Sequence, residues 1–251
     1  MASVEINYRK IHGEKVAAVT INRLEKMNAL NSGMVHKLKS AFELLSNDCT
    51  IRAVILGSAG DKAWVGGADI KEMARLCSRS KARDFIQKLH KAMLSIRNLQ
   101  VPVIAKVEGF CLGAGMELAA ACDLRVASQT ARFGMPEVQV GLPSVIEASL
   151  LPGLMGRGRA ARLVLTGEII NAKKAYEWGF VEEVVSKDKM VMAIDKIASN
   201  ICQAGYYAIA TQKALLRQWE QVSPDTAAQD SIETFASAFD RDEPVTRLTQ
   251  F

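Results

Sequence analysis

Two short stretches of this chain combine glycines and carboxylates in a way that suits acid–base chemistry beside a carbonyl group. The first, GFCLGAGMELAAACD (residues 109–123), places three glycines before a helical pattern that carries Glu117 about one turn inside. The second, FGMPEVQVG (residues 133–141), holds Glu137 after a proline in an apolar setting. An apolar setting raises the pKa of a carboxyl, and two such acids can act as general acid and base.

The glycine-rich turns themselves could bind a developing negative charge. The first N–H groups of a helix lack partners within the helix, and glycines let a ligand approach the backbone closely. A second turn of this kind, WVGGADIKEM (residues 64–73), also follows a buried strand. In a parallel sheet both turns would emerge at one carboxyl edge, where two backbone N–H groups could form an oxyanion hole. Taken singly, the first turn fits close helix–strand packing, the second fits an ordinary loop before a helix, and each acid fits a cap or a solvated carboxylate.

The elements that must position these residues alternate between strands and helices. Apolar, β-rich runs predict buried strands over residues 16–23, 51–60, 101–109 and 123–128. Residues 32–48 have helical spacing, with Ser32 as the expected N-cap. From about Ser144 onward the patterns are mostly helical, and an amphipathic segment covers residues 224–240. The alternation predicts an α/β core with parallel strand pairing, followed by a helical region.

Composition limits the classes of protein to which the chain can belong. It has 251 residues, 49% of them hydrophobic, which is enough for a sizeable buried core. The formal net charge of +5 suits an anionic small ligand. The basic residues are scattered, so nucleic acid is not the expected partner. The tightest basic group, Arg157, Arg159 and Arg162, fits a solvated helix face, with a phosphate patch as the alternative.

Cysteine and histidine usage points away from disulfides and metal sites. The five cysteines are odd in number and include no C-x-x-C pair, which favours a reducing compartment. His12, His36 and His90 lie far apart and outside every motif, so each is expected on the surface or on a helix face. The sequence has no signal-peptide pattern and no apolar run of membrane-spanning length, so we expect a cytoplasmic protein with no membrane partner.

Four motifs in order resemble the crotonase (enoyl-CoA hydratase/isomerase) family, and enoyl-CoA hydratases most closely. They are KMNALN, GGADIKEM, GFCLGAGMELAAACDLRVAS and FGMPEVQVGLP, and the match extends over roughly residues 10–180. The resemblance implies a crotonase-like α/β fold of repeated ββα units in residues 1–190. It implies a helical C-terminal trimerisation region in residues 191–251, and hence a homotrimer or hexamer.

The same resemblance implies roles for individual residues. The backbone N–H groups of Ala68 and Ala114 would bind the thioester oxygen, and Glu117 and Glu137 would be the two catalytic carboxylates. Further positions would lie along the acyl-CoA: Lys26, Asn28, Ala29, Leu30, Gly67, Asp69, Ile70, Leu112, Gly113 and Pro136. The implied reaction adds water to a 2-enoyl-CoA, as in fatty acid metabolism, and gives a 3-hydroxyacyl-CoA. No metal or redox cofactor is expected, because CoA arrives with the substrate.

The sequence departs from the family pattern at two places. Ala114 stands where glycine is common, which is acceptable for a backbone donor if its φ is negative. PSVIEAS (residues 143–149) replaces a glycine-rich stretch, and its Ser144 and Glu147 have the S-x-x-E spacing of a capping box at a helix start. The alternative is that Glu147 supplies a third carboxylate or a bulkier wall near the acyl pocket.

Other functions remain open at this point. Within the family, a double-bond isomerase often relies on one acid, so two acids favour hydration, and a CoA-thioester lyase is a further alternative. A dinucleotide-binding dehydrogenase would need G-x-G-x-x-G, which Gly109, Gly113 and Gly115 do not form. A non-catalytic CoA- or RNA-binding protein could share the fold, although the acid pair argues against it.

Overall fold

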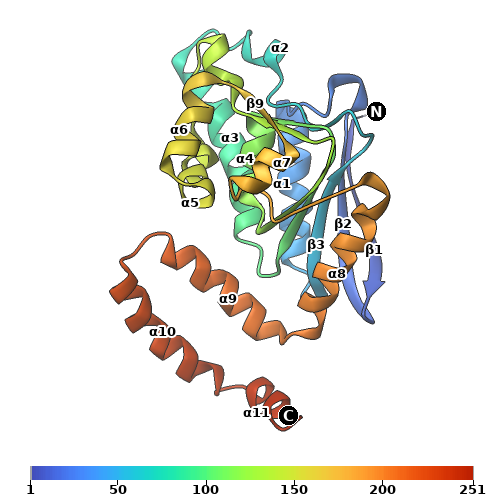
Figure 1. Cartoon of the computed structure of the whole chain (residues 1–251), viewed down its shortest axis with the longest axis vertical. Helices are drawn as coiled ribbons and strands as arrows, with labels where there is room; N and C mark the ends of the chain where they lie inside the picture. Colours follow the sequence, from blue (N-terminus) through green and yellow to red (C-terminus); the bar gives the residue numbers. More distant parts are fainter. Residues whose placement is uncertain (1, 251) are drawn as a thin grey trace.

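Two β-sheets of unequal size organise the molecule in the computed structural model, which describes residues 2–250 (Figure 1). The larger sheet has the order β1-β2-β3-β5-β7-β10 and the smaller one has the order β4-β6-β8-β9. The larger contains β1 (Ser3–Ile11), β2 (Glu14–Asn22), β3 (Ile51–Ser58), β5 (Val103–Val107), β7 (Leu124–Ser128) and β10 (Glu183–Val185). The smaller contains β4 (Ala63–Val65), β6 (Phe110–Leu112), β8 (Arg132–Gly134) and β9 (Ile169–Asn171).

The helices follow the predicted alternation in the first half of the chain and dominate the second half. They are α1 (Ser32–Ser46), α2 (Ile70–Met73), α3 (Arg79–Arg97), α4 (Ala114–Ala121), α5 (Leu151–Met155), α6 (Arg157–Thr166), α7 (Ala172–Glu177), α8 (Met190–Gln203), α9 (Tyr206–Trp219), α10 (Pro224–Ala238) and α11 (Asp242–Leu248). Short 3-10 turns are η1 (Leu24–Lys26), η2 (Pro136–Val140), η3 (Ile146–Leu150) and η4 (Lys187–Lys189). The mixed α/β fold class is thereby confirmed.

Strand pairing is parallel at the centre of both sheets and antiparallel at one edge of each. β2, β3, β5, β7 and β10 run parallel, as do β4, β6 and β8. β1 pairs with β2 as a hairpin whose two turn residues, His12 and Gly13, both have positive φ. That backbone suits a tight hairpin because its twist matches that of the two strands. The strand pattern of the sequence did not predict β1 or this antiparallel edge.

One helix boundary differs from the expectation by a single residue. Asn31, and not Ser32, is the N-cap of α1, because the Asn31 side chain accepts a hydrogen bond of 2.9 Å from the Met34 N–H. Both residue types cap helices well, so spacing alone could not separate them. The helix buries the apolar face that its spacing predicts: Met34, Val35, Leu38, Ala41, Phe42 and Leu45.

Helices cover both faces of the larger sheet. On one face, α8 packs through Met190, Ile194 and Ala198 against Val16 and Ile104 of the sheet. On the other face, α1, α3 and α4 enclose the main core, which contains Phe42, Trp64 and Leu89 among its fully buried residues. α8 packs on the sheet, so the C-terminal helices that lie away from the sheet are α9, α10 and α11 (Figure 1). The division of the chain near residue 190 stays a prediction.

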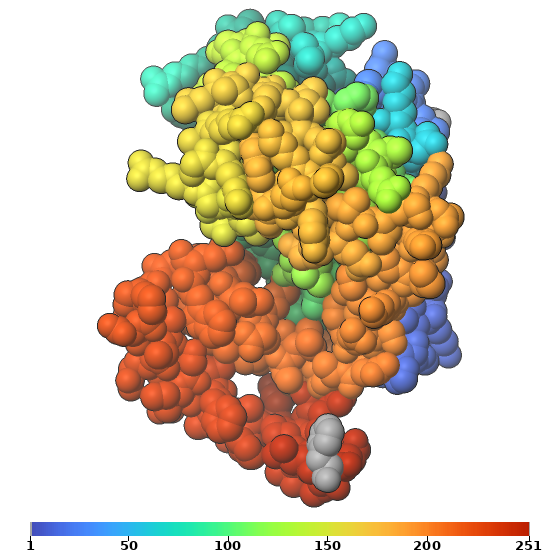
Figure 2. All heavy atoms as spheres, viewed as in Figure 1, coloured from blue at the N-terminus to red at the C-terminus, as the bar shows by residue number. Residues whose placement is uncertain are grey.

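The last three helices form an arm that leaves the core, drawn in red-orange in Figures 1 and 2. Neither α10 nor α11 buries a residue in the single chain. Large apolar side chains of the arm are exposed: Ile232, Phe235, Phe239, Val245 and Leu248. None of the helices within residues 2–250 combines the length and apolar character needed to cross a membrane.

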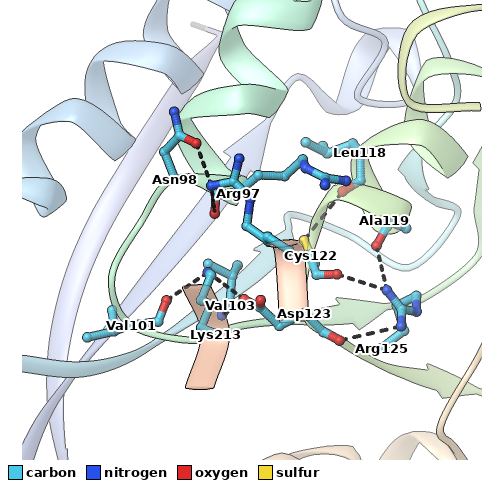
Figure 3. A network of polar contacts seen from close by, with 11 residues as sticks. Arg97, Asn98, Val101, Val103, Leu118, Ala119, Cys122, Asp123, Arg125 and Lys213 are labelled. Atoms are coloured by element: carbon cyan, nitrogen blue, oxygen red, sulfur yellow. Dashed lines mark hydrogen bonds and ion pairs between the residues drawn. The ribbon is translucent and has the colours of Figure 1, made fainter. Parts of the chain in front are cut away.

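A buried lysine ties the arm to the core (Figure 3). Lys213 of α9 is 6% exposed, and its Nζ donates to the Val101 carbonyl at 3.0 Å and to Asp123 Oδ2 at 2.6 Å. The same Asp123 oxygen accepts the Val103 N–H at 2.7 Å. Burial lowers the pKa of Lys213, and the nearby Asp123 carboxylate opposes that shift. α9 is therefore held by a paired charge that also fixes the start of β5.

Candidate active site

The two glycine-rich turns leave neighbouring parallel strands of the smaller sheet. β4 leads into Gly67, β6 leads into Gly113, and the two strands pair with each other. Gly67 has φ 114 and Gly113 has φ 50, conformations that L side chains rarely adopt. A side chain on Gly115 would overlap the Val65 carbonyl, so only glycine lets the first turn of α4 lie against β4. The glycines thus bring the two turns side by side.

Each turn offers a backbone N–H without a protein acceptor. Within residues 2–250, neither the Ala68 nor the Ala114 N–H donates a hydrogen bond to the backbone. Ala114 is the first residue of α4, and it is not among the residues with positive φ. Ala114 therefore has the negative φ that a residue with a side chain needs in order to serve as a backbone donor at this position. The partial positive charge of the helix N-terminus adds to the attraction for an oxyanion.

Glu117 lies in the first turn of α4 and is only 3% exposed. Burial raises its pKa to about 8, the charge of Glu137 adds to the shift, and backbone hydrogen bonds from Ala148 and Val145 oppose it. Glu147 also contributes to the increase. Glu117 is therefore largely protonated at neutral pH in the free protein.

Glu137 reaches the same place from a different segment. It follows Pro136, which begins η2, and its Oε1 lies so close to Gly113 that a side chain there would collide with it. Its Oε2 accepts a hydrogen bond of 3.0 Å from the Ser144 hydroxyl. The two acids that the sequence singles out thus meet at the N-terminus of α4, beside the two free amides.

The capping box predicted for Ser144 and Glu147 is wrong. η3 begins after Val145 and has no side-chain cap, because the Ser144 hydroxyl binds Glu137 instead. Glu147 is 3% exposed, and its Oε1 lies 2.8 Å from His90 Nδ1 on α3. Burial raises the pKa of Glu147, and His90 opposes the increase. The alternative of a third carboxylate near the site describes the structure better.

His90 is a residue of this region that sequence reasoning missed. The sequence predicts a plain surface or helix-face histidine, and His90 does lie half exposed on α3. Its partner is 57 positions away along the chain, so no local pattern joins the two. The one available signal was an acid in a stretch where glycines are expected.

Several of the positions expected along an acyl-CoA lie close together. Around the first turn, the Leu30 N–H donates to the Gly67 carbonyl at 2.8 Å. Leu30 and Ala68 form an isolated parallel β-bridge. Gly67 lies beside the Leu112 carbonyl. Lys26 and Ile70 are exposed, and Ala29 is half-buried. These backbone contacts hold the segment that follows β2 against the turn that follows β4.

Two side chains of the expected set are already engaged within the protein. Asn28 is 1% exposed, and its amide donates to the carbonyls of Ala59 and Ala63 while its oxygen accepts the Arg23 N–H. Asp69 caps α2 and pairs with Arg23 at 2.7 Å. Both therefore shape the turn from inside the protein.

The part of the chain that the structure describes contains no cluster of three or more histidine, cysteine, aspartate or glutamate side chains placed to hold a metal ion. The groups that meet at the site are two backbone donors and two carboxyl groups, and burial raises the pKa of one of these, Glu117. Donors aimed at a developing oxyanion, with an acid and a base on the same side, suit proton transfer at the carbon next to a thioester carbonyl.

Comparison with known proteins gives one consistent result. Residues 12–251 match the profile of the family described as Enoyl-CoA hydratase/isomerase. A crotonyl-CoA hydratase of Syntrophomonas wolfei is 36% identical over 239 residues, covering 95% of this chain and 92% of that protein. A short-chain-enoyl-CoA hydratase of Clostridium acetobutylicum is 37% identical over 94% of this chain and 91% of that protein. The crystal structure of an enoyl-CoA hydratase from Bacillus anthracis superposes with a TM-score of 0.92 at 29% identity, over 98% of this chain and 95% of that one.

Proposed function

This chain belongs to the enoyl-CoA hydratase/isomerase family, and we propose that it adds water to a 2-enoyl-CoA to give a 3-hydroxyacyl-CoA. The assignment as a hydro-lyase agrees with the relatives named above, which match over more than nine-tenths of their length. The observation that carries the proposal is the pair of acids at the N-terminus of α4, one of which has a pKa of about 8. Hydration requires one acid and one base, and this pair supplies both.

The reaction would proceed on one side of the double bond. The thioester oxygen accepts hydrogen bonds from the Ala68 and Ala114 N–H groups, which stabilise the enolate-like transition state. The ionised carboxyl of the Glu117–Glu137 pair takes a proton from water, whose oxygen attacks Cβ. The protonated carboxyl delivers a proton to Cα. One proton enters the pair and one leaves it, so the pair ends each addition with the charge that it began with.

The family name also covers isomerases, and a lyase acting on a CoA thioester is a further alternative. An isomerase moves one proton between two carbons and can do so with a single acid. The hydrogen bond from Ser144 that holds Glu137 beside Glu117 supports a role for both acids. The deciding experiment is turnover of a panel of 2-enoyl-CoA and 3-enoyl-CoA thioesters, followed by the absorbance of the conjugated thioester. Loss of that absorbance with the 2-enoyl compounds is the expected result, and turnover of the 3-enoyl compounds alone would refute hydration.

We propose that the protein works as a trimer or a pair of trimers. The arm of α9 to α11 exposes Phe235, Phe239 and Leu248, a larger apolar surface than a monomer usually leaves open. A groove of about 830 Å³ between α9 and α10 is lined in part by Tyr207 and Trp219. A second copy of the chain is the proposed cover for this surface.

The setting of the reaction is also a proposal. Water addition is redox-neutral, and the amides and acids supply its chemistry, so we propose that it needs no cofactor besides the CoA of the substrate. All five cysteines are free thiols, which suits a reducing compartment such as the cytoplasm.

A further inference from the structure

A buried carboxylate with an unused oxygen lies next to the proposed catalytic pair. Glu147 is 3% exposed, and its Oε1 is engaged by His90 Nδ1 at 2.8 Å. Its Oε2 is fully buried and has no hydrogen-bond partner in residues 2–250. Buried polar atoms are nearly always paired, because an unpaired one loses its hydration without compensation. The oxygen therefore suits a donor that the substrate brings.

The backbone that carries Glu147 is strained and is tied to the catalytic acid. Ile146 has φ 41, in the left-handed region that a β-branched residue rarely adopts. Such strain persists where surrounding contacts enforce it, often at functional sites. Here the backbone groups of Val145 and Ala148, on either side of Ile146 and Glu147, lie close enough to Glu117 to lower its pKa. The contacts that hold Glu117 thus also fix Glu147 beside it.

A cavity of about 640 Å³ lies beside Glu147. Ile146 and Glu147 line it together with Ala120, which lies one turn beyond Glu117 on the same face of α4. Its wall continues along Leu94 and Leu150, which are apolar. Since Glu147 is also near enough to Glu117 to raise its pKa, this cavity is the space next to the catalytic pair that an acyl chain could enter.

The charges around the cavity select the kind of group that fits. Arg97 and Arg217 line it on one side, and Glu147 and Glu220 line it as well. Beside Glu147 a carboxylate on the substrate would meet a like charge, and beside the two arginines an ammonium group would meet one. A neutral hydroxyl avoids both repulsions and can donate to the free oxygen of Glu147.

We infer that Glu147, oriented by His90, is a specificity-determining residue that accepts a hydrogen bond from a hydroxyl group on the acyl chain. The preferred substrate is then a hydroxylated 2-enoyl-CoA. This inference rests on the proposed hydration reaction and names its substrate class. A purely aliphatic chain leaves the buried oxygen unpaired, and sites built to bind a hydroxyl discriminate strongly against analogues that lack it.

The wild-type protein provides the first test. Matched sets of 2-enoyl-CoA thioesters, from butenoyl to octenoyl, would end in a methyl group, a hydroxymethyl group or a carboxylate. We expect kcat/KM for the hydroxylated member to exceed that of both partners by roughly tenfold or more at one chain length at least. Hydration with no such preference at any length overturns the inference and leaves hydration itself standing. Absence of hydration with every thioester overturns both.

Two variants test whether Glu147 causes the preference for hydroxylated substrates. Glu147→Met keeps the length of the side chain and removes the acceptor, so the ratio of kcat/KM between hydroxylated and aliphatic substrates should fall by roughly tenfold. Glu43→Gln removes the charge of an exposed carboxylate that is paired with Lys39 on α1, away from the cavity, and its ratio should match that of the wild type. Equal changes in both variants, or an unchanged ratio in Glu147→Met, would refute the role of Glu147. Circular dichroism and the melting temperature establish folding, and the wild-type ratio remains decisive if Glu147→Met does not fold.

Discussion

The hydroxyl of Ser144 donates a hydrogen bond of 3.0 Å to Oε2 of Glu137. Because the other oxygen of Glu137 lies against Gly113, this bond fixes the carboxylate between the loop before η3 and the start of α4. Hydrogen bonds to a carboxylate are stronger than those between neutral groups.

Removing that bond should slow the reaction without unfolding the protein. In Ser144→Ala, Glu137 loses one donor, and kcat for hydration should fall by roughly tenfold, the equivalent of a lost hydrogen bond to a charged group. KM should change little, because Ser144 is not expected to contact CoA. The matched control is Ser80→Ala, an exposed serine on α3, which should behave as the wild type. An unchanged kcat in Ser144→Ala would mean that Glu137 is held by other contacts.

The two acids should each be needed for hydration. Glu117→Gln and Glu137→Gln should each lower kcat by roughly 10²–10⁴-fold, the range for a lost general acid or base, while CoA-ester binding is retained. The double variant should be far less than multiplicatively worse, since the two groups act in one proton cycle. Steady-state hydration of crotonyl-CoA gives kcat for the single variants and for the double variant. Near wild-type rates in the two single variants would rule out the two-glutamate mechanism.

The activity should decline on the alkaline side. The free protein holds one proton on Glu117 because burial and the charge of Glu137 raise its pKa to about 8. Above that pH Glu117 is ionised and the reaction lacks its acid, so kcat/KM should decrease as pH rises through about 8. The pH profile of kcat/KM tests this directly. A profile that stays flat well above that pH would show that Glu117 is not protonated in the free enzyme.

The same shift predicts a change in stability. Glu117 titrates near its usual 4.5 in the unfolded chain and at about 8 in the fold, so between these values the unfolded state loses its proton first and stability decreases with pH. Glu117→Gln cannot ionise. The free energy of unfolding of this variant, minus that of the wild type, should therefore increase between pH 4.5 and 8 by on the order of 1–4 kcal/mol. Below pH 4.5 this difference should not depend on pH. Denaturant melts of both proteins across this window provide the measurement, and a constant difference would contradict the assigned pKa.

The exposed arm should control assembly. Replacing Phe235 and Phe239 by glutamate places charges on the apolar surface of α10 and should shift a trimer or hexamer towards the monomer. Deletion of the segment after Ser223 should have the same effect. Light scattering at micromolar concentration reports the mass, and Lys173→Glu on the distant α7 is a charge-changing control. A wild-type protein that is already monomeric would refute the proposed assembly.

The sequence by itself determined the parts of the site that depend on local chemistry. Only glycine fits the backbone at Gly113 and the close approach at Gly115, so those spacings predict both the turn and the start of α4. Helical periodicity then places Glu117 one turn inside, and Pro136 begins the short turn that holds Glu137. These features follow from backbone sterics and periodicity, which act over a few residues and can therefore be recognised in a sequence.

Tertiary structure decided which polar groups found each other. Ser144 and Glu147 have the spacing of a capping box, yet Ser144 binds Glu137 and Glu147 binds His90 on α3. A buried carboxyl takes whichever partner the packing of the elements brings near, and the partner of Glu147 comes from a helix 57 positions earlier in the chain. The pKa of Glu117 is likewise set by burial and by charges from other segments. Such pairings depend on how the elements pack, and no local pattern records that packing.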